Sequence, residues 1–165
     1  MTDSIQSHGQ EKIQKYLNKV REKLDYPSDL YVDLAELILF QTQLRFTTGV
    51  GVDGRAWQKS WRARVQSGQT LRDTGRLLNS LKPQTNRNQI SVKTNVKYAP
   101  LMQFGGIIRA KNGKYLTFKT PTSGWVKVKS VYIPPRPFFG INPDDSQEIL
   151  FEIEEYLERI LNDGT

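Results

Sequence analysis

The 165-residue sequence contains no cysteine, one histidine and no long apolar run. The absence of cysteine excludes disulfides, thiolate metal sites and a cysteine nucleophile. Without about 18 consecutive apolar residues we expect no membrane-spanning helix, and the N-terminus lacks the charged start and apolar stretch of a signal peptide. We therefore expect one domain over residues 1–165, synthesised in the cytoplasm and without a membrane partner.

Acidic residues are scarce in the middle of the chain. Residues 45–136 contain eighteen Lys and Arg but only Asp53 and Asp73, a net charge of +16, whereas residues 1–44 and 137–165 carry −2 and −7. This asymmetry predicts either a polyanionic partner or complementary surfaces that meet within an assembly. A third interpretation is a solvated basic sheet that the protein's own C-terminal helix neutralises.

The residues that catalysis would need are poorly placed. His8 lies in a polar segment, 1–10, that we expect to be flexible, so it is a weak candidate for activating a nucleophile or binding a metal. Asp53 fits a glycine-rich turn and Asp73 fits a helix start, where a carboxylate stabilises the dipole. We predict no catalytic residue, no metal ligand and no cofactor.

One glycine-rich stretch, GVGVDG at Gly49–Gly54, has the spacing of a dinucleotide-binding loop. In such proteins the glycines follow a buried strand and open a helix, so that backbone N–H groups point at the pyrophosphate. Here the preceding residues have the pattern of a helix, and no acidic residue except Asp73 follows at about the distance that ribose binding requires. The stretch therefore predicts a loop.

Apolar stripes predict helices over residues 11–48 and 142–163. The first helix has its stripe at Ile13, Tyr16, Leu17, Val20 and Leu24, and the second, from Leu30, ends near Gly49. In the last helix, Asn142 is the expected cap and Pro143 the first helical residue.

The intervening residues divide into a loop with a short helix (49–88) and an antiparallel sheet followed by a Pro-rich arm (89–141). The arm is the segment PPRPFFGINP, which begins at Pro134. The short helix is expected at 70–82, and the first strand at 89–97. Asn112-Gly113 predicts a hairpin turn between two strand-like runs. Residues 125–133 read as one strand with Lys127 and Lys129 on one face and Val126, Val128 and Tyr132 on the other. The fold class is α+β, with N-terminal helices and a C-terminal helix packed on a small antiparallel sheet of about three to four strands.

Aromatic and basic residues suggest two kinds of surface. Trp57 and Trp61 share a face if their segment is helical, either as a core anchor or as a base-stacking pair. Five basic residues are candidates for an interface or a lumen: Arg109, Lys111, Lys114, Lys127 and Lys129. No known nucleic-acid-binding signature accompanies them, and DNA or RNA binding through residues 45–136 is the alternative function.

Four segments in order carry a family resemblance: RFTTGVGVDGRAWQKSW, LRDTGRLLNSL, YAPLMQFGG and VYIPPRPFFGI. Over about residues 37–160 the chain resembles the phage virion morphogenesis (tail completion) family of contractile-tailed phages similar to Mu and P2. The matching positions are Phe46, Gly54, Trp57, Thr74, Gly75, Tyr98, Gln103, Phe104, Gly105, Pro134, Arg136, Pro137 and Phe138. The chain departs from the family pattern at Val52, where proline is frequent, and at Met102, where histidine is frequent.

The resemblance implies a non-enzymatic structural protein of the virion, without cofactors. Such a protein is expected to form a six-fold ring at the neck or tail end, completing the tail or joining head to tail. Its partners would be copies of itself and neck and tail proteins, namely the connector or portal on one side and the tail tube or sheath on the other, with non-specific DNA contact in the lumen. In this setting Gly54 turns the chain so that Trp57 packs. Arg136 is expected to hold the Pro-rich arm against a neighbouring subunit or the sheet through carboxylate or carbonyl contacts.

Overall fold

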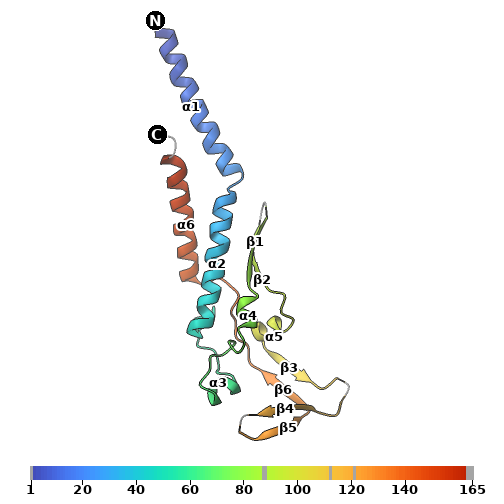
Figure 1. Ribbon diagram of the computed structural model, residues 1–165. Coiled ribbons are helices and arrows are strands. Elements are labelled where there is room, and N and C mark those ends of the chain that lie inside the picture. The colour runs from blue at the N-terminus through green and yellow to red at the C-terminus, as the bar shows by residue number, and fades with distance from the viewer. Residues whose placement is uncertain (1, 87–88, 112, 121, 163–165) are drawn as a thin grey trace.

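The computed structural model describes residues 2–86, 89–111, 113–120 and 122–162. Within these ranges the chain forms six helices and six strands, which confirms the α+β class. The molecule is elongated (Figure 1): α1 projects from one end, and the hairpin of β4 and β5 forms the other. Helix α6 returns alongside α2, so that both ends of the chain lie at the same end of the molecule.

The three long helices agree with the apolar stripes. They are α1 (Thr2–Asp25), α2 (Ser28–Thr48) and α6 (Pro143–Asn162). Helix α2 ends as predicted at Gly49, whose φ of 71° allows its N–H to donate to the carbonyl of Arg45 at 2.8 Å. At the start of α6, the side chain of Asn142 accepts the N–H of Asp145 at 2.8 Å, which confirms the predicted cap. Helix α1 begins earlier than predicted and extends through most of segment 1–10.

The strands form three separate two-stranded antiparallel sheets. They pair β1 (Lys82–Asn86) with β2 (Gln89–Lys93), β3 (Gly106–Arg109) with β6 (Ser130–Ile133), and β4 (Leu116–Thr120) with β5 (Gly124–Val128). Strand β1 lies in the region predicted to be loop and helix, because its sequence KPQTN has no apolar alternation. The antiparallel strands are therefore distributed along the molecule instead of forming one sheet of three to four strands.

The predicted hairpin around Asn112-Gly113 is wrong as a pairing. The runs on either side do not pair with each other, because β3 pairs with β6 while β4 pairs with β5. Asn112 itself lies outside the described residues. The turn signal at Asn112-Gly113 is local and contains no information about β6. The backbone groups of β3 form their hydrogen bonds with β6 and not with β4.

The single strand predicted over 125–133 is interrupted. Strand β5 ends at Val128 and β6 begins at Ser130, and each pairs with a different partner. The interruption changes the alternation, so Val126 and Val128 are half-buried as predicted, whereas Tyr132 is exposed. A period of two holds only within an uninterrupted strand.

The helix predicted over 70–82 is reduced to α4 (Arg76–Asn79). Leu71 has a φ of 62° and Gly75 a φ of 74°, and a helix cannot pass through either conformation. Two further short helices are α3 (Trp61–Val65) and α5 (Ala99–Phe104).

Two groups of buried side chains hold the elements together, and both use α2. One joins α2 to α6 through Leu30, Leu34, Tyr156 and Ile160. The other lies at the far end of α2 and contains Phe46, Trp57, Leu77, Leu81, Val96, Ala99 and Phe138. Because α2 also packs on β1 and β2, it is the central support of the fold.

Candidate functional site

An aromatic cluster connects α2, the glycine-rich loop and the Pro-rich arm. Phe46 and Trp57 meet edge to face with ring centroids 5.6 Å apart, and Phe46 lies 5.2 Å from Phe138. Gly54 has a φ of 72° and turns the loop, and the N–H of Trp57 donates to the carbonyl of Gly49 at 2.7 Å. GVGVDG is therefore a loop that positions Trp57.

The two tryptophans of this region have different environments. Trp57 is 7% exposed, whereas Trp61 is 45% exposed and has the guanidinium of Arg64 5.5 Å from its ring. The condition for a shared helical face is not met, because α3 begins only at Trp61. Trp57 is the core anchor, and the pair is not a stacking platform.

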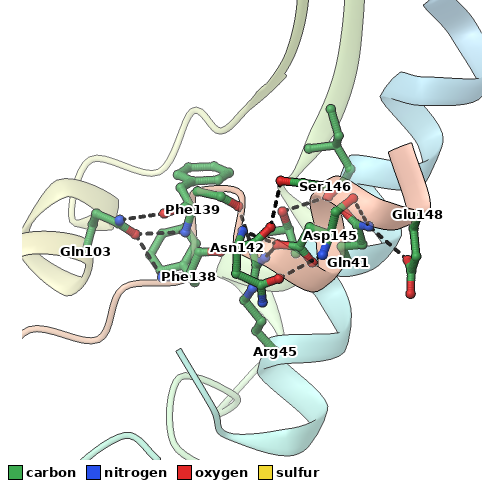
Figure 2. Close-up of polar contacts among 12 residues, drawn as sticks. Gln41, Arg45, Gln103, Phe138, Phe139, Asn142, Asp145, Ser146 and Glu148 are labelled. Atoms are coloured by element: carbon green, nitrogen blue, oxygen red, sulfur yellow. Dashed lines mark hydrogen bonds and ion pairs between the residues drawn. The ribbon is translucent and has the colours of Figure 1, made fainter. Parts of the chain in front are cut away.

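Gln103 fastens the Pro-rich arm to α5 (Figure 2). Its side-chain oxygen accepts the N–H groups of Phe138 and Phe139, both at 2.9 Å, and its Nε2 donates to the carbonyl of Phe139 at 2.9 Å. The side-chain amide of Gln103 thus forms hydrogen bonds with three backbone groups of the arm at a place where the arm is not part of a strand. This arrangement explains why a glutamine at this position suits the arm.

Arg45 and Asp145 form a buried ion pair where the arm enters α6 (Figure 2). Arg45 is 6% exposed, and its Nη1 donates to the carbonyls of Phe138 at 2.9 Å and Gly140 at 3.0 Å. Burial lowers the pKa of the Arg45 guanidinium, and the carboxylate of Asp145 opposes that shift. Asp145 also accepts the N–H of Asn142 at 2.8 Å, so one carboxylate completes both the ion pair and the helix cap.

Gly105 allows the arm to pass close to the end of α5. Its φ is 70°, and a Cβ there would lie 2.7 Å from the nitrogen of Pro135 and 2.8 Å from the carbonyl oxygen of Ile133. The adjoining residues are tied together, because the N–H of Arg136 donates to the carbonyl of Met102 at 2.8 Å. A side chain at Gly105 would displace the arm.

The side chain of Arg136 is buried, and its Nε donates to the carbonyl of Gln58 in the same subunit at 3.0 Å. The predicted carbonyl contact is therefore present, but it is made to the loop that follows Trp57 and not to a sheet. Pro137 joins the same region, because its carbonyl accepts the N–H of Val52 at 3.0 Å. Pro134 is half-buried beside them.

We predict that Gln103→Leu lowers the free energy of unfolding by about 1–3 kcal/mol, because the N–H groups of Phe138 and Phe139 lose their acceptor. Urea denaturation of the purified protein measures the change. Gln66→Leu, at an exposed glutamine, is the control and is expected to stay within about 0.5 kcal/mol of the wild type. Equal values for the two variants would contradict the role of Gln103.

The remaining predicted residues lie at the surface. Thr74, Gly75 and Tyr98 line a small cavity, and Phe104 is 76% exposed at the end of α5. Arg109, Lys111, Lys114, Lys127 and Lys129 are all exposed on or beside β3 and β5. Within the described ranges none of these five has a carboxylate partner.

Sequence reasoning missed Gln41, Arg45 and Asp145 as buried polar residues. Gln41 donates to a carboxylate oxygen of Glu148 at 2.9 Å, adding a second contact between α2 and α6. A signal was present, since Gln41 and Arg45 follow Leu34 at positions i+7 and i+11, on a face that is otherwise apolar. Asp145 lies in the first turn of α6, where interaction of a carboxylate with the helix dipole is a sufficient local explanation.

The described residues contain no group of three or more His, Asp or Glu side chains placed to hold a metal ion. No helix in the same ranges is long and apolar enough to cross a membrane. Asp73 lies 3.4 Å from Arg62 and not at the helix start expected for it, and Asp53 accepts the N–H of Arg55 at 3.2 Å.

The chain belongs to the phage virion morphogenesis family, whose model matches residues 9–158. It is 33% identical over 111 residues to Mu-like prophage FluMu G protein 2 of Haemophilus influenzae, covering 67% of this chain and 66% of that protein. No solved structure matches the chain significantly. The family resemblance is confirmed, and the protein's role lies in phage virion morphogenesis.

Proposed function

We propose that the protein is a non-enzymatic ring component at the neck or tail end of a tailed-phage virion, where it completes the tail or joins the head to it. The observation that carries the proposal is its surface area. The chain exposes 12209 Å², whereas a compact monomer of its mass of 19.0 kDa exposes about 8,400 Å². An obligate interface buries about 2,000–5,000 Å² in total over its two partners. A subunit of a ring takes part in two interfaces and so buries that area itself, which matches the excess of roughly 3,800 Å².

Exposed apolar side chains support assembly. On α6, Leu150, Leu157 and Leu161 are all exposed, and their spacing of i, i+7 and i+11 places them on one face. At the opposite end of the molecule, Trp125 and Tyr132 are exposed on β5 and β6. Exposed apolar surface of this extent is typical of protein interfaces.

The charge distribution favours a head-to-tail ring. Such a ring needs two different surfaces that complement each other. The exposed carboxylates of α6 (Glu154, Glu155 and Glu158) provide one, and the exposed basic residues around β3 and β5 provide the other. We propose six copies in the ring, with the connector or portal on one side and the tail tube or sheath on the other. Basic residues left facing the lumen would meet passing DNA without sequence preference.

We predict that Leu150→Asp abolishes assembly while leaving the fold intact. Purified protein is added to tails from a phage lacking the gene, and binding is measured by co-sedimentation and electron microscopy. The wild type is expected to bind as a ring and Leu150→Asp to bind at least tenfold less, because it places a charge in the apolar face. Gln147→Asp, at an exposed polar site on the same helix, is the matched control.

The competing function is DNA or RNA binding through residues 45–136. It would give submicromolar duplex affinity at physiological salt, with a log–log salt slope of about −5 to −9 for six to ten phosphate contacts. We expect weak binding instead, because no base-reading motif is present and the ring would place the acidic α6 of a neighbouring subunit against the basic surface. Tight DNA binding by a permanent monomer that ignores tails would overturn the ring proposal.

A further inference from the structure

A cavity of about 180 Å³ lies between the loop after Trp57, α4, α5 and the Pro-rich arm. Its lining includes Ser60, Arg62, Thr70, Thr74, Tyr98 and Arg136. Thr74 is exposed, so the cavity opens to the surface, whereas Arg136 is 5% exposed. The cavity is large enough for a carboxylate group with its adjoining methylene groups.

Arg136 is a buried cation without a counter-charge. Its Nε donates to the carbonyl of Gln58, and neither Nη atom has a hydrogen bond or ion pair within the described part of the chain. Burial lowers the pKa of Arg136, and no carboxylate opposes the shift. Arg45, by contrast, is buried with the carboxylate of Asp145 as its ion-pair partner. An anion in the cavity would supply the counter-charge that the fold does not provide.

Apart from Asp73, the polar side chains of the cavity have hydrogens to donate. The hydroxyl oxygens of Ser60, Thr70 and Thr74 each accept a backbone N–H, at 3.1 to 3.3 Å, which leaves their O–H hydrogens to donate. Tyr98 adds a phenol whose hydroxyl makes no hydrogen bond to the described residues. Asp73 is the sole acid among the lining residues and lies 3.4 Å from Arg62. A set of donors around an unpaired guanidinium is suited to an anion.

We propose that this cavity is a carboxylate-binding site, which an acidic side chain of another protein chain occupies in the assembled virion. The assembly role proposed above enters this proposal only in identifying where that acidic side chain comes from. The carboxylate comes either from a second copy, whose α6 exposes Glu154, Glu155 and Glu158, or from another virion protein. Binding would neutralise Arg136 and fasten the neighbour to the arm and the loop at once.

The test is a titration of the free protein with sodium acetate against sodium chloride at equal ionic strength, followed by the side-chain NMR signal of Arg136 Nε–H. Its absence in Arg136→Lys assigns the signal. We expect a saturable shift with acetate and none with chloride. Tyr98→Phe, which keeps the ring, should weaken acetate binding about tenfold. Arg109→Met, at an exposed arginine on β3, should leave it unchanged.

Equal, unsaturable responses to both salts would overturn the proposal, as would an unchanged affinity in Tyr98→Phe. Displacement of acetate by a short DNA duplex would overturn it in favour of phosphate. The variant with Glu154, Glu155 and Glu158 all changed to glutamine identifies the source. If it binds acetate, and its loss of tail binding does not add to that of Arg136→Lys when the changes are combined, the carboxylate belongs to a second copy. If it assembles normally, or if the two losses add, the carboxylate belongs to another protein. If the protein binds acetate but never binds tails, the ring proposal is wrong and the carboxylate-binding site is not.

Discussion

Replacing Asp145 with alanine is expected to lower the free energy of unfolding by about 3–5 kcal/mol, because it leaves Arg45 as a buried and uncompensated charge. Arg45 would keep its bonds to the carbonyls of Phe138 and Gly140, but these carry no charge. The cap at Asn142 would lose an acceptor as well. Denaturant unfolding followed by circular dichroism measures the loss.

The neighbouring residue provides the control. Asp144 is also in the first turn of α6 but is exposed, so Asp144→Ala removes only a dipole interaction worth about 0.3–1 kcal/mol. The double variant Arg45→Met with Asp145→Leu should recover much of the loss, because it removes both charges. If the Asp145 and Asp144 variants lose the same stability, the pair does not hold the arm to α6.

Trp57→Ala is expected to cost about 3–5 kcal/mol, the range for truncating a buried large aromatic. The indole packs edge to face on Phe46 and fills the space under the loop. Its Nε1 is buried without a hydrogen-bond partner among the described residues. Trp57→Phe should therefore lose less than half as much, because it keeps a ring and removes an unsatisfied donor. Thermal and urea unfolding both report the difference.

Trp61→Ala separates the packing role of Trp57 from a general effect of removing tryptophan. Trp61 is largely exposed and has Arg64 near its ring, so its loss should cost no more than about 1 kcal/mol. An unfolding curve for Trp57→Ala that overlays the wild type would place Trp57 in an interface and disprove its role as a core anchor.

Local signals predicted the elements that local chemistry controls. The ends of α2 and α6 depend on Gly49, Asn142 and Pro143, whose conformational preferences are properties of single residues. Strand pairing was less predictable. Strand β1 has no apolar alternation, and β3 pairs with β6, which begins twenty-one residues after β3 ends. Such pairings depend on distant partners, which a local pattern does not contain.

The candidate site shows the same division. Gln103, Arg136 and Phe138 were singled out from a family resemblance, but their contacts with the arm and the loop appear only in three dimensions. Arg136 was expected to hold the arm, and the structure makes it part of a donor-lined cavity. Arg45 and Asp145 were not singled out, because each has an ordinary local explanation until the other is beside it.

The sequence by itself determined the three long helices, the uneven charge, the α+β class and the family, because each of these depends on composition, periodicity or ordered motifs. Only the tertiary structure decided which polar residues are buried, which strands pair, and which of two tryptophans packs inside. The physical reason is that burial and pairing are properties of two segments together. Asp145 lies 100 residues from Arg45 along the chain, and only folding brings the two charges into contact.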